Sequence, residues 1–150
     1  MNDQANSYDI VIVGGGSAGI ATAASLLIRR HWLNIAIVEP KEDHYYQPGW
    51  TMVGGGIFVS AETIRSEESV IPDGVTWLKD EVTTFDPDNN SVNLKSGGSA
   101  RYKSLVVAPG LKLNLTAVDG LAETMGKNGV TSNYILDSAP YTWELVQKFH

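Results

Sequence analysis

The sequence contains no cysteine, and this absence excludes several kinds of chemistry. Without cysteine the chain forms no disulfide, no zinc–thiolate cluster and no thiolate nucleophile. The three histidines, His31, His44 and His150, lack the spacing of metal ligands. We therefore expect no metal site, a solvated helix end around His31, and, at His44, a structural hydrogen bond to its own loop rather than proton transfer.

Positive charge is also scarce. Eleven lysines and arginines stand against seventeen acidic residues, and the net charge of −6 argues against binding to nucleic acid. The first eight residues are polar and carry no basic side chain, so they do not resemble a targeting peptide and we expect a cytoplasmic start. A hydrophobic content of 43% in 150 residues predicts one folded domain rather than a disordered chain.

One uncharged run, residues 10–28, is long enough to imitate a membrane span at 19 residues. However, each of the three glycines at 14–16 would destabilise a helix interior by about 1 kcal/mol relative to alanine. Residues 10–13 are β-branched and favour a buried strand. The run therefore predicts a strand, a tight turn and a helix.

The glycine cluster fits the pattern G-x-G-x-x-G at the point where this strand passes into the helix. With a strand at 9–13, a helix at 17–30 and a second strand at 34–38, the first part of the chain forms a βαβ unit. In this context the pattern is typical of a dinucleotide site, whereas a bare match would be weak evidence.

Each residue of the pattern has an expected role in holding a dinucleotide. Gly14 allows the sharp turn, Gly16 lets a pyrophosphate approach the backbone, and Gly19 lets the helix pack closely on the strand. The amides of Gly16, Ser17 and Ala18 then meet the negative charge at the N-terminus of the helix.

Glu39 ends the second strand, 20 residues after Gly19. A carboxylate at this place accepts hydrogen bonds from the adenosine ribose and repels a 2′-phosphate, which disfavours NADP. These residues leave NAD and FAD open, because both use this geometry.

The rest of the chain departs from the alternating helices and strands of an NAD domain. We expect a long loop at 40–56 and a short polar helix at 60–69. Strands at 75–85, 91–95 and 100–108, separated by turn-rich segments, predict an antiparallel meander. The predicted fold class is therefore α/β: a Rossmann-like domain, with a parallel sheet and helices, that carries a three-stranded antiparallel β-meander.

This meander favours FAD over NAD. In disulfide-reductase-like flavoproteins the last meander strand returns to the parent sheet and ends in a glycine close to the cofactor pyrophosphate, and Gly110 has that place. Residues 111–150 read as loop until a helix at 138–149.

Two further clusters receive structural interpretations. The second glycine triplet, at 54–56, follows no strand and lacks the final glycine, so we expect a flexible loop and no second nucleotide site. Glu67 and Glu68 resemble a carboxylate pair, but neighbours on a helix point apart, so we expect solvated surface there.

The chain also carries a series of short motifs: Val38-Glu39-Pro40, His44-Tyr45-Tyr46-Gln47-Pro48, Trp50-Thr51, Val53-Gly54 and Val70-Ile71-Pro72-Asp73-Gly74-Val75. In this combination the chain resembles the sulfide:quinone oxidoreductase family, specifically its mitochondrial-like group. The likeness runs from about Tyr8 to the end and includes Ser132-Asn133-Tyr134 and Trp143. It is far more specific than the glycine pattern.

The resemblance implies a flavoprotein with two dinucleotide-binding-type domains. Such an enzyme oxidises sulfide at a pair of cysteines, passes two electrons to FAD and delivers them to a membrane quinone. In this chain Gln47 would lie along the cofactor, Val82 would meet the adenine through its backbone, and Gly110 would complete the phosphate pocket. The implied FAD contacts are Gly14, Gly16, Ser17, Ala18, Gly19, Glu39, Gln47, Val82 and Gly110.

The resemblance also places the cysteines and the membrane-contacting helices beyond residue 150. We therefore expect an N-terminal fragment of a longer enzyme. Its parts would be the first part of the FAD domain at 1–110 (βαβ 9–39, loop and helix 40–72, meander 75–108) and the start of a second domain at 111–150. We expect no catalytic residue here, no activity from this stretch alone, and a full-length protein in the cytoplasm, peripheral to the inner membrane, with homo-oligomerisation left open.

Two other functions stay open from the residues. A type II NADH dehydrogenase, or another NAD(P)H-dependent flavoprotein, would share the fold. A non-catalytic nucleotide-binding module would use it without redox chemistry. A second G-x-G-x-x-G further along would favour nicotinamide, whereas a cysteine in a proline-flanked turn would favour sulfide.

Overall fold

The computed structural model describes residues 6–149, which form two compact units. The first unit contains the described residues up to His44 together with Ser66–Gly110. The second contains Tyr45–Arg65 and the described residues from Leu111 onward. These compact units do not follow the expected parts 1–110 and 111–150, because residues 45–65 pack with the C-terminal part. Which parts form domains of the complete protein stays a prediction. The expectations that concern residues 1–5 and His150 lie outside the described residues.

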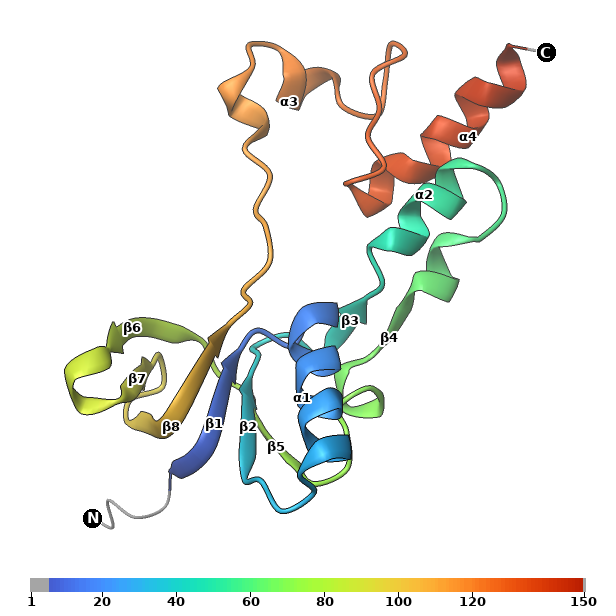
Figure 1. The fold of residues 1–150 in the computed structure, drawn as a ribbon. Helices are drawn as coiled ribbons and strands as arrows, with labels where there is room; N and C mark the ends of the chain where they lie inside the picture. The colour runs from blue at the N-terminus through green and yellow to red at the C-terminus, as the bar shows by residue number, and fades with distance from the viewer. Residues whose placement is uncertain (1–5, 150) are drawn as a thin grey trace. The chain divides into compact units, whose positions relative to one another are not determined.

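A six-stranded sheet with the strand order β5-β2-β1-β8-β7-β6 forms the centre of the first unit (Figure 1). Its strands are β1 (Ser7–Val13), β2 (Ile35–Val38), β5 (Val75–Leu78), β6 (Val82–Asp86), β7 (Ser91–Leu94) and β8 (Ser99–Val107). β1 runs parallel to β2 and β8, and β2 runs parallel to β5. β6, β7 and β8 are antiparallel neighbours. The predicted parallel sheet and three-stranded meander are confirmed, and β8 joins them.

The expected single strand at 75–85 is wrong, because the structure divides it into β5 and β6. The break falls at Asp80, whose carboxylate accepts a 2.7 Å hydrogen bond from the amide of Glu81 and a 3.3 Å bond from the amide of Ser96. Aspartate that bonds nearby backbone amides favours a turn over a continuous strand. β5 consequently extends the parallel side of the sheet and β6 begins the meander.

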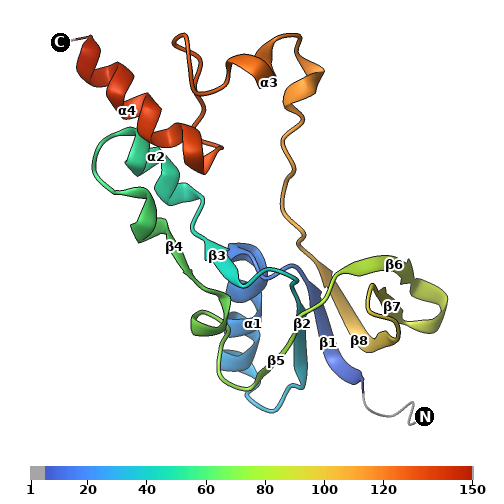
Figure 2. The same cartoon turned by 180° about the vertical axis from the view of Figure 1, so that it is seen from behind.

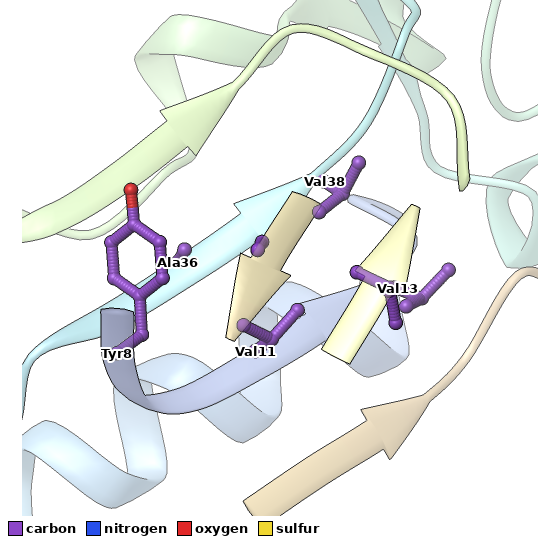
Figure 3. Close-up of a cluster of buried hydrophobic side chains, with 7 residues drawn as sticks. Tyr8, Val11, Val13, Ala36 and Val38 are labelled. Atoms are coloured by element: carbon purple, nitrogen blue, oxygen red, sulfur yellow. The ribbon is translucent and has the colours of Figure 1, made fainter. Parts of the chain in front are cut away.

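The core lies on both faces of β1 and β2, since alternate residues of a strand point to opposite faces. On one face Ile12 and Ile37 pack with Ala23 of α1 (Ser17–Arg29), which lies against the sheet (Figures 1 and 2). On the other face the buried cluster includes Val11, and Figure 3 shows it with Tyr8, Val13, Ala36 and Val38. All four residues of β2 are buried, as expected for a parallel strand covered on both faces.

The segment that follows Glu39 is more ordered than the expected long loop and polar helix. It contains β3 (Asp43–Tyr45), α2 (Pro48–Gly54) and β4 (Ile64–Ser66), and β3 and β4 pair in a small second sheet. Pro48 occupies the first turn of α2, where backbone N–H groups have no partner within the helix, so the N–H that proline lacks is not needed there. In place of a helix at 60–69, two single 3₁₀ turns (Ser60–Thr63 and Glu67–Ser69) flank β4. Both expectations were therefore wrong.

The second unit packs α2 against α4 (Ala139–Lys148), which confirms the predicted C-terminal helix. Gly54 and Gly56 are close-packed there rather than part of an open loop. A Cβ atom at Gly54 would lie 2.4 Å from the Asn133 side chain, and one at Gly56 would lie 2.4 Å from Trp143. A short α3 (Leu121–Thr124) and 3₁₀ turns at Leu115–Ala117 and Leu136–Ser138 complete this unit, and Pro87–Asn89 forms another such turn between β6 and β7. Across residues 6–149, no helix has both the length and the apolar character needed to cross a membrane.

Candidate functional site

The glycine loop between β1 and α1 is shaped by close backbone contacts. Gly14 has a φ of +105°, and a Cβ atom there would lie 2.2 Å from the carbonyl oxygen of Ala108. A Cβ atom at Gly19 would lie 1.9 Å from the carbonyl oxygen of Gly14, so the first turn of α1 rests directly on the loop. Only glycine fits these two positions without rearrangement. They have the turn and packing geometry expected of them.

The N-terminus of α1 is open to solvent. Gly16, Ser17 and Ala18 are exposed, and a Cβ atom at Gly16 would meet nothing within 4 Å. No side chain in the described part of the chain caps this terminus by a hydrogen bond. The free amides and the positive end of the helix dipole therefore form a ready anion site on a 13-residue helix.

Glu39 is held beside this loop by backbone amides. Its Oε2 atom accepts a 2.9 Å hydrogen bond from the amide of Gly15, and its Oε1 atom accepts one of 2.9 Å from the amide of Lys41. Nε1 of Trp77 donates to the Glu39 carbonyl oxygen at 2.9 Å. A carboxylate has about four acceptor sites. Glu39 therefore keeps acceptor capacity for the hydroxyls of a ribose.

The expectation that Glu67 lies on the solvated surface is wrong. Glu67 is 1% exposed, and a Cβ atom at Gly15 would lie 2.1 Å from its Oε1 and 2.8 Å from Cβ of Glu39. Glu68, its neighbour, is exposed as expected. Burial raises the pKa of the Glu67 carboxyl above its ordinary value, the nearby His44 opposes this shift, and the charge of Glu39 adds to it.

His44 links Glu67 to the glycine loop. Its Nδ1 atom lies 3.1 Å from the carbonyl oxygen of Gly15 and 3.3 Å from Oε2 of Glu67. Because a carbonyl oxygen only accepts, Nδ1 carries the hydrogen in this arrangement. His44 makes a structural hydrogen bond, but to the glycine loop rather than to its own loop as expected. His31 is exposed as expected. The sequence contained no signal for the buried Glu67–His44 pair, since it depends on the path of the chain between the two residues.

The other residues predicted to contact the cofactor, Gly110, Val82 and Gln47, lie in three different parts of the structure. Gly110 is exposed and has a φ of +77°. It directly follows Ala108 and Pro109, whose backbone lies against Gly14 of the glycine loop. Val82 begins β6, and its side chain packs on the apolar cluster of the sheet. Gln47 is exposed and immediately precedes α2 in the second unit. The structure thus brings Gly110 towards the glycine loop, whereas the cofactor roles of all these residues stay predictions.

Comparisons with known proteins found a family model and several relatives that match most of the chain. A family model described as pyridine nucleotide-disulphide oxidoreductase matches residues 8–141. The chain is 49% identical over 143 residues to the mitochondrial sulfide:quinone oxidoreductase of Dictyostelium discoideum and 39% identical over 144 residues to that of Mus musculus. These alignments cover 95% and 96% of this chain and 32% of each relative.

A solved structure is similar over the same extent. The X-ray structure of the sulfide:quinone oxidoreductase from Aquifex aeolicus matches with a TM-score of 0.74 at 25% identity, covering 97% of this chain and 32% of the other. The chain therefore spans about a third of the length of these relatives.

Proposed function

Since this chain belongs to the pyridine nucleotide-disulphide oxidoreductase family, we propose that it forms part of the FAD-binding region of a sulfide:quinone oxidoreductase. The relatives that bear this name are similar over nearly the whole chain, at 49% and 39% identity. The complete protein would oxidise sulfide and deliver the electrons to a quinone.

The observation that carries the proposal is the pairing of an open helix terminus with a fixed carboxylate. The exposed amides of Gly16, Ser17 and Ala18 would hold the pyrophosphate, and Glu39, held by the amide of Gly15, would accept the adenosine ribose hydroxyls. The open space at Gly16 fits a close approach of phosphate to the backbone. The residues present therefore suit FAD.

Three further contacts belong to the proposal. Gly110 would complete the phosphate pocket, Val82 would meet the adenine, and Gln47 would lie along the cofactor. Bound FAD supplies two-electron redox chemistry, while the residues of this chain bind and orient it. The chain has no cysteine. The sulfide-oxidising cysteines and the quinone and membrane contacts would accordingly lie in the rest of the protein, and residues 111–150 would begin its second domain.

The test is the visible spectrum of the full gene product, recorded without oxygen before and after addition of sulfide or NADH. We expect a bound flavin that sulfide bleaches and NADH does not. Bleaching by NADH alone would contradict the sulfide assignment and leave the FAD site in place. The absence of flavin from the folded protein would contradict both.

A matched pair of variants locates the flavin. Gly16→Asp adds a negative charge at the open helix terminus, where a Cβ atom meets nothing within 4 Å, so we expect loss of bound flavin from a folded protein. Ala21→Asp makes a similar charge change at an exposed position further along α1 and should retain the flavin. Equal flavin content in both variants would contradict the proposed pyrophosphate site.

A further inference from the structure

The buried carboxyl of Glu67 lies against the glycine loop, and the proposed function gives it no role. Its Oε2 atom lies 3.3 Å from Nδ1 of His44, while its Oε1 atom is buried without a hydrogen-bond partner among the described residues. The same Oε1 atom occupies the space that a side chain at Gly15 would need. An unpaired buried carboxylate oxygen carries a desolvation penalty unless it takes up a proton or finds a donor.

We propose that Glu67 is a proton-linked positioning residue of the dinucleotide site, where binding of a dinucleotide is coupled to uptake of one proton from solvent by Oε1 of Glu67. This inference rests on the function proposed above. The proton binds an oxygen that has no other partner, and no bond to the ligand is formed or broken.

The hydrogen bonds of His44 determine which oxygen receives the proton. Nδ1 of His44 faces two oxygens, the carbonyl of Gly15 at 3.1 Å and Oε2 of Glu67 at 3.3 Å. Since Nδ1 carries the hydrogen, Oε2 acts as an acceptor. An added proton is therefore accommodated on Oε1 without loss of the contact with His44.

The charges around Glu67 explain the coupling. Two ionisable side chains act on its carboxyl: His44 of β3 and Glu39, which follows β2. Glu39 packs on the same side of Gly15 as Oε1. A pyrophosphate bound at the adjoining amides of Gly16–Ala18 would add further negative charge close to this pair of carboxyls. Because a like charge disfavours the ionised form of an acid, the bound dinucleotide favours protonated Glu67.

Burial already favours the protonated form of Glu67 before any ligand binds. The pKa of the Glu67 carboxyl is raised chiefly by burial, and the charge of Glu39 raises it further against the opposing effect of His44. A neutral Glu67 also removes a negative charge from behind the loop, and the loop amides then face the pyrophosphate with less repulsion. Affinity for the dinucleotide should therefore fall as the pH rises.

Isothermal titration calorimetry of the full gene product, stripped of flavin and titrated with FAD, measures the coupling. Titrations in buffers of different ionisation enthalpy, between about pH 5.5 and 8, give the number of protons taken up. We expect uptake approaching one proton within this window and a dissociation constant that rises by up to about tenfold per pH unit. FAD binding without proton uptake would overturn this inference and leave the proposed function intact, whereas no binding at any pH would overturn the proposed function itself.

Two variants identify the group that takes up the proton. Glu67→Gln has nearly the same shape but cannot titrate, so its FAD affinity should be independent of pH. Glu68→Gln changes the exposed neighbour and should behave as the wild type. A pH dependence that persists in folded Glu67→Gln assigns the proton to another group and overturns the inference. Should this variant not fold, the proton number of the wild type decides.

Discussion

The Oε2 atom of Glu39 accepts a 2.9 Å hydrogen bond from the backbone amide of Gly15, 24 residues earlier in the chain. This bond ties the end of β2 to the glycine loop that follows β1. The second carboxylate oxygen is held by the amide of Lys41. The orientation of the carboxylate is therefore set by the fold itself, and such preorganisation lowers the entropy lost when a ligand binds.

The two adjacent glycines of the loop should respond differently to alanine. Gly15→Ala would place a methyl group 2.1 Å from Oε1 of Glu67 and 2.8 Å from Cβ of Glu39. We expect a loss of about 1–3 kcal/mol in the free energy of unfolding, as for other overpacked sites. Gly16→Ala meets nothing within 4 Å and should change stability by less than about 0.5 kcal/mol, but it should weaken FAD binding. Denaturant unfolding and FAD titration separate the two effects, and equal stability of the variants would contradict this packing.

Glu39→Gln tests the carboxylate that faces the proposed ribose site. The introduced side-chain amide retains one acceptor oxygen, but its NH₂ group faces a backbone N–H from which the Glu39 carboxylate accepts a hydrogen bond. A hydrogen bond to a charged group contributes about 1.5–3 kcal/mol, so we expect FAD affinity to fall by about 10- to 100-fold. Glu68→Gln, an exposed change of the same kind, should leave affinity unaltered. An unchanged dissociation constant in Glu39→Gln would argue against ribose recognition by this residue.

The sequence allowed prediction of those parts of the site that depend on local patterns. A β-branched run, a glycine triplet and a second apolar strand ending in Glu39 are short-range signals, and the structure has β1, α1 and β2 within one residue of the expected bounds at most of their ends. The turn-rich segments predicted the antiparallel meander, whereas the return of β8 to the parallel sheet was expected only from the likeness to disulfide-reductase-like flavoproteins.

Glu67 escaped prediction because its burial depends on contacts distant in the sequence. The residue belongs to a single 3₁₀ turn, where no period of apolar residues distinguishes a buried side chain from an exposed one. Its position beside Gly15 depends on the pairing of β3 with β4. The sequence predicted a loop where β3 lies, so this pairing was not expected. The packing of Gly56 on Trp143 was missed for the same reason, since the two residues lie far apart in the chain.

Gly56→Ala tests the packing of the second unit. Gly56 has a φ of +73°, and a methyl group there would lie 2.4 Å from the Trp143 ring, so strain and overlap act together. We expect destabilisation by about 1–3 kcal/mol. The neighbouring Gly55→Ala meets its nearest atom at an ordinary 3.5 Å and should be tolerated. Thermal unfolding of the two variants gives the comparison, and similar midpoints would show that Gly56 does not pack as described.

The stability of the ligand-free protein should depend on pH through Glu67. Because burial raises the pKa of this carboxyl in the folded state above the unfolded value of about 4.3, the folded protein binds more protons between these two values. Its contribution to stability is therefore complete below the unfolded pKa and is lost as the pH rises through the folded pKa. Urea unfolding of wild type and Glu67→Gln across this range isolates the effect, since other titrating groups are common to both. We expect the free energy of unfolding of the wild type to fall relative to the variant as the pH rises, and a constant difference would mean that the carboxyl titrates alike in both states.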